Sequence, residues 1–277
     1  MSKIEESMEY FRKKASCYDL VETQLYWNLS DELLWNILMT TALDKFHGRS
    51  MKFMDAGGGT GRWSIKILDY LSESTCVLCD ISDEMRSEAL KKIKERGLDQ
   101  RALIKKYNIE NMPSEDSNSY DLVMNLHNVL GFTDNAEKAL FEMYRVLKPG
   151  GLLISVVPNK YHAVFFNILL RRFDAARHIA ENSKGTFTDS MPEITMFTPD
   201  GIRKYYEKMD MKDINIFGFP VTIYPQAEEA KISGTSLTLE EILSNKKTFD
   251  LIASIEKDMI SEEAAARGNN LFIIGRK

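Results

Sequence analysis

Cysteine and proline are scarce in this sequence, and long apolar runs are missing. The 277 residues include 3 Cys and 7 Pro. So few cysteines, and an odd number of them, exclude a disulfide-stapled miniprotein and indicate free thiols in a reducing compartment. No stretch is apolar for long enough to span a bilayer, and no apolar segment follows the charged N-terminus. We therefore expect a cytoplasmic protein without a membrane partner.

A surplus of positive charge is also missing. Lys and Arg number 36 against 41 Asp and Glu, which gives a formal net charge of -5 at pH 7. Dedicated nucleic-acid-binding proteins usually carry a basic surplus, so an RNA partner would require a local basic patch. The composition, 44% hydrophobic and 28% charged, is that of an ordinary globular protein and excludes a disordered chain.

Two of the cysteines, Cys76 and Cys79, have the spacing of a metal-binding pair. They fall in TCVLCD, which has the pattern of a strand, and strand positions three apart point to opposite faces. We therefore expect two small core residues and no metal.

From about residue 51, short apolar runs alternate with amphipathic helical stretches. This alternation predicts an α/β fold with a doubly wound, mostly parallel sheet. Strands are expected at 51–56, 75–80, 102–107, 120–127, 152–157, 211–219 and 271–276. Helices are expected at about 61–71, 83–96, 134–151, 160–183, from 199, and at 238–262.

Polar residues mark where several helices should begin. Ser30, Ser82 and Thr238 are predicted N-caps, Asp134 opens a capping pair, and Thr198 precedes a proline at the first helical position. In each case a side-chain oxygen would accept a hydrogen bond from a free backbone N–H of the first turn.

The chain divides into two parts. Residues 4–47 look helical, and we predict an N-terminal helical cap over 1–48 followed by one domain over 49–277. After the strand at 152–157, the alternation is interrupted by a helical stretch and a polar loop. We expect this insertion, at about 159–197, to cover a substrate as a lid.

The strongest local signal is FMDAGGGTGR, a strand that ends in Asp55 and leads through a glycine-rich turn into a helix. Gly57, Gly59 and Gly61 allow a tight turn and a close approach of the backbone to a ligand. Their spacing departs from the dinucleotide fingerprint G-x-G-x-x-G, and the GK[ST] of a Walker loop is missing. The turn alone is also compatible with a plain strand-to-helix connection.

With these residues the chain resembles the class I S-adenosylmethionine-dependent methyltransferases, whose first motif, D/E-x-G-x-G-x-G, is matched by Asp55 and the three glycines. The resemblance is to the quinone-biosynthesis-like and natural-product branches. It implies a Rossmann-like sheet of seven strands in the order 3-2-1-4-5-7-6 with the last strand antiparallel. It also implies S-adenosyl-L-methionine as the cofactor and S-adenosyl-L-homocysteine as the product.

Two later segments extend the resemblance to the nucleoside part of the cofactor. Asp80 in LCDISDEM stands where the family places an acid that accepts from both ribose hydroxyls, and Ile81 and Met85 would pack on the adenine. Asn108 in YNIENMP stands where the family usually has an Asp that contacts the adenine amino group, with Ile109 beside it. An amide oxygen can accept the same hydrogen bond.

The same resemblance assigns residues to the methionine part. Asn125 and Leu126, near the end of the strand at 120–127, would line it. The segment ASCYD resembles an A-x-x-Y-D element that folds over the cofactor, which would bring Tyr18 to the sulfonium region. The alternative for Tyr18 is an ordinary buried tyrosine. Together the motifs run from about 53 to 151 in the expected order.

Methyl transfer from a sulfonium is an in-line displacement that positioning and desolvation accelerate, and it requires no metal. A general base helps where the acceptor is a hydroxyl or a protonated amine. His127 and His162 both follow strands, at the sheet edge where ligands bind, and each is a candidate catalytic base. The alternative for each is a structural or surface histidine.

We predict a methyltransferase that acts on an oxygen or nitrogen atom of a small-molecule acceptor. One alternative is a transfer-RNA wobble-uridine carboxyl methyltransferase, which PNKYHAVFFNILLRRFD also resembles, although the acidic balance argues mildly against nucleic acid. Another is a catalytically silent partner protein that binds S-adenosylmethionine. A nicotinamide-dependent dehydrogenase is disfavoured by the glycine spacing. Fold and cofactor motifs determine neither the acceptor nor the oligomeric state.

Overall fold

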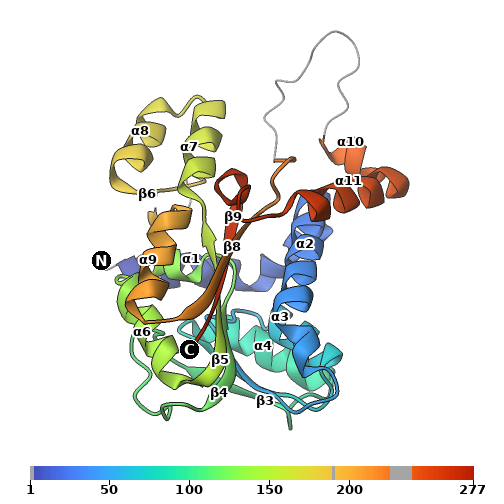
Figure 1. The fold of residues 1–277 in the computed structure, drawn as a ribbon, viewed down its shortest axis with the longest axis vertical. Helices are drawn as coiled ribbons and strands as arrows, with labels where there is room; N and C mark the ends of the chain where they lie inside the picture. The colour runs from blue at the N-terminus through green and yellow to red at the C-terminus, as the bar shows by residue number, and fades with distance from the viewer. Residues whose placement is uncertain (1–2, 189–190, 225–238) are drawn as a thin grey trace.

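The computed structural model describes residues 3–188, 191–224 and 239–277. Within them, seven strands form one sheet in the order β3-β2-β1-β4-β5-β9-β8 (Figure 1). The strands are β1 (Lys52–Ala56), β2 (Thr75–Asp80), β3 (Ala102–Lys106), β4 (Tyr120–Asn125), β5 (Leu147–Pro158), β8 (Lys212–Phe219) and β9 (Asn270–Arg276). Because β8 and β9 are the sixth and seventh strands of this sheet, the order is the expected 3-2-1-4-5-7-6. The predicted fold class is confirmed.

Strand directions also follow the prediction. The first five strands pair in parallel, whereas β9 runs antiparallel to both β5 and β8. The carboxyl ends of β1 to β4 therefore meet at one edge of the sheet, and the loops that follow them lie close together. This edge is where ligands bind in open α/β sheets.

Helices cover both faces of the sheet. One core lies between the sheet and α2 (Leu25–Thr41), α3 (Arg62–Tyr70), α4 (Asp83–Glu95), α10 (Leu239–Ser244) and α11 (Lys246–Met259). The other lies under α6 (Ala136–Val146) and α9 (Pro199–Lys208). Neighbouring strand residues enter opposite cores because strand side chains alternate: Phe53 joins the first core and Met54 the second.

The two cysteines of β2 also enter opposite cores. Cys76 is buried in the first, where its Sγ lies 3.6 Å from Ser64 Oγ, and Cys79 is buried in the second. No group of three or more metal-ligating side chains occurs among the described residues.

The N-terminal segment consists of α1 (Lys3–Lys14), a 3-10 helix, η1 (Ala15–Thr23), then α2 and a second 3-10 helix, η2 (Leu43–Phe46). The helix α1 contacts α4 and the short helix α5 (Val129–Phe132). The predicted N-cap at Ser30 is wrong, because α2 already begins at Leu25 and Ser30 lies buried within it. Leu29 and Leu33 are fully buried on either side of Ser30, so the apolar face of α2 runs past this residue.

Two other predicted caps are confirmed. Ser82 Oγ accepts from the backbone N–H of Met85 at the start of α4, and Thr198 Oγ1 accepts from that of Gly201 at the start of α9. These hydrogen bonds satisfy backbone donors that the first helical turn leaves free.

The helix expected over 134–151 is shorter than predicted. It begins after Asn135, whose Oδ1 accepts from the Lys138 N–H, so the cap is one residue later than Asp134. It ends at Val146, and residues 148–151 belong to β5. The helix expected over 238–262 is broken at Asn245, which caps α11. Its predicted cap, Thr238, lies outside the described residues.

The insertion after β5 is a helical hairpin followed by a two-stranded ribbon. It contains α7 (Lys160–Leu169), α8 (Phe173–Asn182), β6 (Lys184–Gly185) and β7 (Ile194–Thr195). The helices separate near Arg171, which has a left-handed φ of 60°. A small apolar core joins Ile179 and Ile194 to Phe132 of α5. None of the described helices is long and apolar enough to cross a membrane.

Candidate functional site

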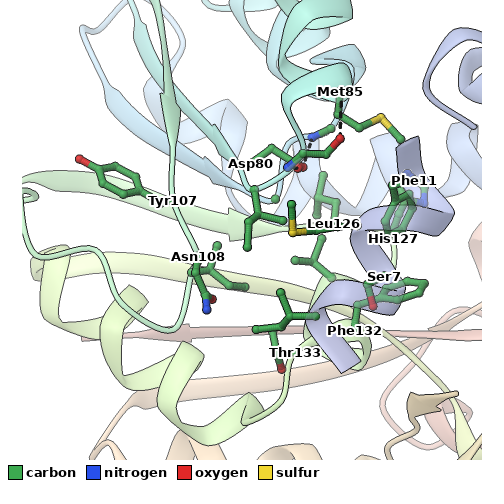
Figure 2. Close-up of a pocket in the computed structure, with 18 of the residues that line it drawn as sticks. Ser7, Phe11, Asp80, Met85, Tyr107, Asn108, Leu126, His127, Phe132 and Thr133 are labelled. Atoms are coloured by element: carbon green, nitrogen blue, oxygen red, sulfur yellow. Dashed lines mark hydrogen bonds between the residues drawn. The ribbon is translucent and has the colours of Figure 1, made fainter. Parts of the chain in front are cut away.

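A cavity opens at the carboxyl ends of β1, β2 and β4 and is covered on one side by α1 (Figure 2). It holds about 770 Å³ of space, counting its opening to solvent. Its wall is built from α1, η1, the glycine-rich turn, the loops after β2, β3 and β4, and α5.

Most of the predicted site residues meet in this cavity. Those that line it are Tyr18, Gly57, Gly59, Asp80, Ile81, Met85, Asn108, Ile109, Leu126 and His127. The residues that do not line it are Asp55, Gly61, Asn125 and His162.

The glycine-rich turn is held against the end of β2. The N–H groups of Gly57 and Gly58 both donate to the carbonyl oxygen of Cys79, at 2.8 and 3.0 Å. Gly57 has φ +78°, and a Cβ there would lie 2.4 Å from Val129 Cγ1. Gly59 has φ +53°, and a Cβ there would have only the sulfur of Met85 within 4 Å, at 4.0 Å. Gly57 therefore allows close packing of the turn, while Gly59 borders open space in the cavity.

Asp80 is positioned by backbone donors. Its Oδ2 accepts from the Gly59 N–H at 3.0 Å, and its Oδ1 accepts from the Ser82 N–H at 2.8 Å. Burial raises the pKa of Asp80, while these two amides favour the carboxylate. A carboxylate offers about four lone pairs, so acceptor capacity is left over for a ligand in the cavity.

The side chain of Asn108 forms a hydrogen bond with the backbone of its own loop. Its Oδ1 accepts from the Glu110 N–H at 2.9 Å. The residue still lines the cavity beside Ile109. A carbonyl oxygen has two lone pairs, so the second remains for a ligand donor.

Asp55 and Gly61 flank the glycine-rich turn but contact other parts of the fold and not the main cavity. Asp55 is buried, Ser64 Oγ donates to its Oδ2 at 2.6 Å, and burial raises the pKa of Asp55 to about 7. It faces a smaller hollow next to the main cavity. A Cβ on Gly61 would lie 3.2 Å from Leu78 and 3.3 Å from Ala89, so this glycine packs α3 against β2 and α4.

The predicted position of Asn125 is corrected by the structure. Its side chain is fully buried in the core and donates to Ser155 Oγ at 2.7 Å, and Ser155 in turn hydrogen-bonds Tyr206 at 2.8 Å. Strand alternation explains the difference, because Asn125 and Leu126 point in opposite directions and only Leu126 reaches the cavity.

Neither histidine is arranged as a free base. His127 lines the cavity, but its Nε2 receives the indole N–H of Trp63 at 2.5 Å, and burial lowers the pKa of His127 to about 3, with Arg62 as a second cause. His162 lies on α7 outside the cavity, with its ring among Phe166 and Tyr224, and burial lowers its pKa to about 4. The structure thus gives His162 no contact with a ligand in this cavity.

The neutral state of His162 predicts a pH effect on stability. Below pH 6.5 the unfolded chain binds a proton at His162 that the folded chain does not bind until about pH 4. Stability is therefore lost as the pH falls through this window. Replacing His162 with Phe should reduce the drop in unfolding free energy between pH 7.5 and pH 5 by about 2 kcal/mol. Urea unfolding at both pH values measures this, and equal drops in the two proteins would refute it.

The N-terminal segment is tied to the glycine-rich turn by polar contacts. Tyr18 lines the cavity, and burial raises its pKa to about 12. Asp19 next to it accepts from Thr60 Oγ1 at 2.6 Å and forms an ion pair with Lys92 of α4. Arg62, directly after the turn, pairs with Asp31 of α2.

Several cavity residues were missed by sequence reasoning. Phe11 of α1 and Phe132 of α5 are 121 positions apart in the chain, yet their ring centroids lie 4.9 Å apart at the cavity wall. Trp63 was missed as the partner of His127. Phe11 and Trp63 lie outside the motifs, and only the packing of α1 and α3 brings them to the site.

These observations agree with a comparison of the chain with protein families. A model described as the ubiE/COQ5 methyltransferase family matches residues 2–175, more than half of the chain. The chain belongs to this family. Its members are S-adenosylmethionine-dependent methyltransferases, so the predicted class I resemblance and the predicted cofactor are confirmed.

Curated relatives carry the same family name. The ubiquinone/menaquinone biosynthesis C-methyltransferase UbiE of Cronobacter sakazakii is 35% identical over 133 residues, 44% of this chain and 52% of that protein. The enzyme of the same name from Agrobacterium fabrum is 26% identical over 220 residues, 78% of this chain and 82% of that protein. The chain thus spans about half the length of the first relative and most of the second.

Solved structures share the fold. A methyltransferase of Thermotoga maritima, described as a possible histamine N-methyltransferase, has a TM-score of 0.60 at 17% identity and covers 98% of this chain and 99% of its own. Phosphoethanolamine N-methyltransferase 2 of Haemonchus contortus, solved with S-adenosylhomocysteine, has a TM-score of 0.56 at 16% identity, covering 88% of this chain and 52% of its own. At these identities the likeness concerns the fold alone.

Proposed function

We propose that this chain transfers a methyl group from S-adenosylmethionine to a carbon atom of an electron-rich, uncharged ring. The chemistry of the cavity wall carries the proposal. Among the described residues that line it, Asp80 is the only one with a charged side chain at neutral pH. The side built by α1 and α5 is largely apolar, with Ile4, Met8, Phe11 and Phe132. An ionised acceptor would lose its hydration there without gaining an ion pair.

A carbon acceptor replaces the oxygen or nitrogen atom predicted from the sequence. The names of the relatives describe C-methylation in quinone biosynthesis, which supports a ring of this kind. The state of His127 supports it as well, since its Nε2 is engaged by Trp63. A phenol-type ring is activated at carbon by its own oxygen and needs no protein base at the attacking atom.

The residues at the other end of the cavity fit the nucleoside of the cofactor. Asp80 would accept hydrogen bonds from the ribose hydroxyls, because its oxygens are fixed by Gly59 and Ser82 and keep free lone pairs. Ile81 and Met85 would pack on the adenine. In the same pocket, Asn108 and Ile109 would contact the adenine edge.

The glycine-rich turn and the N-terminal segment fit the rest of the cofactor. Gly57 and Gly59 border the cavity, and a Cβ on Gly59 would project into open space there. Leu126 and Tyr18 would enclose the methionine part and exclude water. When bound, S-adenosylmethionine supplies a methyl group that its positively charged sulfur makes electrophilic.

We further propose that the helical segment 1–48 and the insertion at 159–197 enclose the acceptor. The segment supplies α1, which lines the cavity. The insertion packs on α5 through Ile194 and Phe132, and Phe132 also lines the cavity. A shift of either the N-terminal segment or the insertion would therefore change the shape of the part of the cavity that we assign to the acceptor.

The test is incubation of the protein with S-adenosylmethionine carrying a ¹³C-methyl group and a panel of hydroquinones, phenols, amines and transfer RNA. We expect a ¹³C-methyl group bound to a ring carbon of a hydroquinone, identified by the NMR shift of the product. A methoxy or N-methyl product, or a base-labile methyl ester on transfer RNA, would overturn the choice of acceptor. Cofactor binding without turnover on any acceptor would identify a silent binding protein.

A further inference from the structure

His127 stands where β4 has ended, and its ring lines the cavity (Figure 2). Its backbone is left-handed, with φ 55°, and so is that of Asn128, with φ 70°. Such conformations are uncommon for residues other than glycine and concentrate at functional sites, where the surrounding structure holds them. The strained pair fixes the direction of the His127 side chain at the cavity.

The environment of Nε2 determines which nitrogen of His127 carries the proton. Trp63 Nε1 donates to Nε2 at 2.5 Å, and Arg62 Nη2 lies 3.3 Å from the same atom. Indole and guanidinium nitrogens only donate hydrogen bonds. Nε2 must therefore accept, and in a neutral imidazole the proton then lies on Nδ1.

The charged groups around the ring do not favour a second proton. Asp31 Oδ1 lies 3.7 Å from Nε2, beyond hydrogen-bond distance, and Asp31 is paired with Arg62. Glu22 also pairs with Arg62, at 3.6 Å. Burial and the positive charge of Arg62 lower the pKa of His127 to about 3, so the ring is neutral at physiological pH.

The other ring nitrogen, Nδ1, is open. None of the described residues forms a hydrogen bond with it, and it is not among the polar atoms that are sealed from solvent without a partner. The side chain is 27% exposed, and the ring borders the cavity. His127 therefore has an unpaired N–H donor on a ring that borders the cavity.

We propose that Trp63 and Arg62 fix His127 as the Nδ1–H tautomer, so that His127 donates a hydrogen bond to an oxygen of the methyl acceptor instead of removing its proton. This inference rests on the proposed function, in which a phenol-type ring carries such an oxygen next to the nucleophilic carbon. Trp63 is a positioning residue, and His127 is a catalytic residue that selects oxygen-bearing rings.

The reaction balances without a protein base. The acceptor binds uncharged, and its hydroxyl loses its proton to water only as the ring carbon forms a bond to the methyl carbon; the Nδ1–H stabilises the partial negative charge on that oxygen. In the same step the bond from methyl to sulfur breaks, and the electron pair of that bond stays on sulfur. The methylated ring carbon finally gives up its hydrogen as a proton to water, which restores the aromatic ring.

Nitrogen-15 NMR tests the tautomer directly, because the chain has only 4 His. The signals of His127 are assigned by their loss in a His127→Gln variant. We expect a protonated Nδ1 and an unprotonated Nε2 that stay unchanged between pH 8 and pH 5.5. In Trp63→Phe we expect part of the population to move to the other tautomer. A protonated Nε2 in the wild type would overturn the proposal, and an unchanged Trp63→Phe spectrum would remove the role of Trp63.

Two substitutions at His127 separate a donor from a base. The amide nitrogen of Asn can stand near Nδ1, whereas the amide of Gln reaches the place of Nε2. With hydroquinone as the probe, turnover should fall at least tenfold more in His127→Gln than in His127→Asn, with the affinity for S-adenosylhomocysteine retained in both. Equal losses, together with a lost acid limb in the pH profile, would establish a base. A wild type that does not methylate hydroquinone would contradict the proposed function while the NMR result still decided the tautomer.

Discussion

Replacing Asp80 with alanine is expected to weaken the binding of S-adenosylmethionine by about 10- to 150-fold. The carboxylate is fixed by the N–H groups of Gly59 and Ser82 in the wall of the cavity. Hydrogen bonds to a charged group contribute about 1.5 to 3 kcal/mol, which corresponds to this range of affinity. Isothermal titration calorimetry with the two proteins measures the change. Asp80→Asn, which keeps one acceptor oxygen, should show an intermediate loss.

Asp83 provides the matched control. It lies three residues further on, at the start of α4, where it pairs with Arg86 and Lys106 outside the cavity. Asp83→Ala removes the same charge from the same region and should leave the affinity unchanged. Equal affinities of wild type and Asp80→Ala would show that this cavity end does not hold the ribose.

Replacing Gly57 with alanine is expected to lower the free energy of unfolding by about 2 to 5 kcal/mol. The left-handed backbone at φ +78° costs an alanine about 1 to 2 kcal/mol. Its Cβ would also lie 2.4 Å from Val129 Cγ1, and overpacking of this kind costs about 1 to 3 kcal/mol. Because Val129 lines the cavity, the affinity for S-adenosylmethionine should fall as well. Urea unfolding gives the stability.

Gly48 separates the two causes. It has a similar φ of +70°, but a Cβ there would have no atom within 4 Å. Gly48→Ala should therefore show the backbone cost alone, about 1 to 2 kcal/mol. Equal losses of stability in the two variants would show that the turn does not pack closely against Val129.

The sheet was predictable because each strand and its loop are contiguous in sequence. One short stretch predicted both the strand TCVLCD, which ends at Asp80, and the helix cap at Ser82. Helix starts were less predictable where polar residues lie inside an apolar surface. Ser30 has the chemistry of a cap, but it is only 3% exposed within α2.

The part of the cavity that we assign to the acceptor is formed by tertiary packing, and patterns in the sequence predict little of it. Phe11 and Phe132 meet only because α1 lies on α5. The sequence places His127 directly after a strand, and this position favoured its prediction as a catalytic base. Its donor partners, Trp63 and Arg62, lie on α3, and no pattern in the sequence connects them with residue 127. The resemblance assigned both Asn125 and Leu126 to the methionine part, but neighbouring strand residues point in opposite directions and only Leu126 lines the cavity.

The most direct test of this account is a calorimetric titration of the purified protein with S-adenosylmethionine, S-adenosylhomocysteine and NADH. The cavity, with Asp80 in its wall and Gly59 beside open space, predicts micromolar binding of both sulfur nucleosides and no binding of NADH. Failure to bind either sulfur nucleoside, or displacement of one by NADH, would contradict the assignment of the cavity as a methyl-donor site.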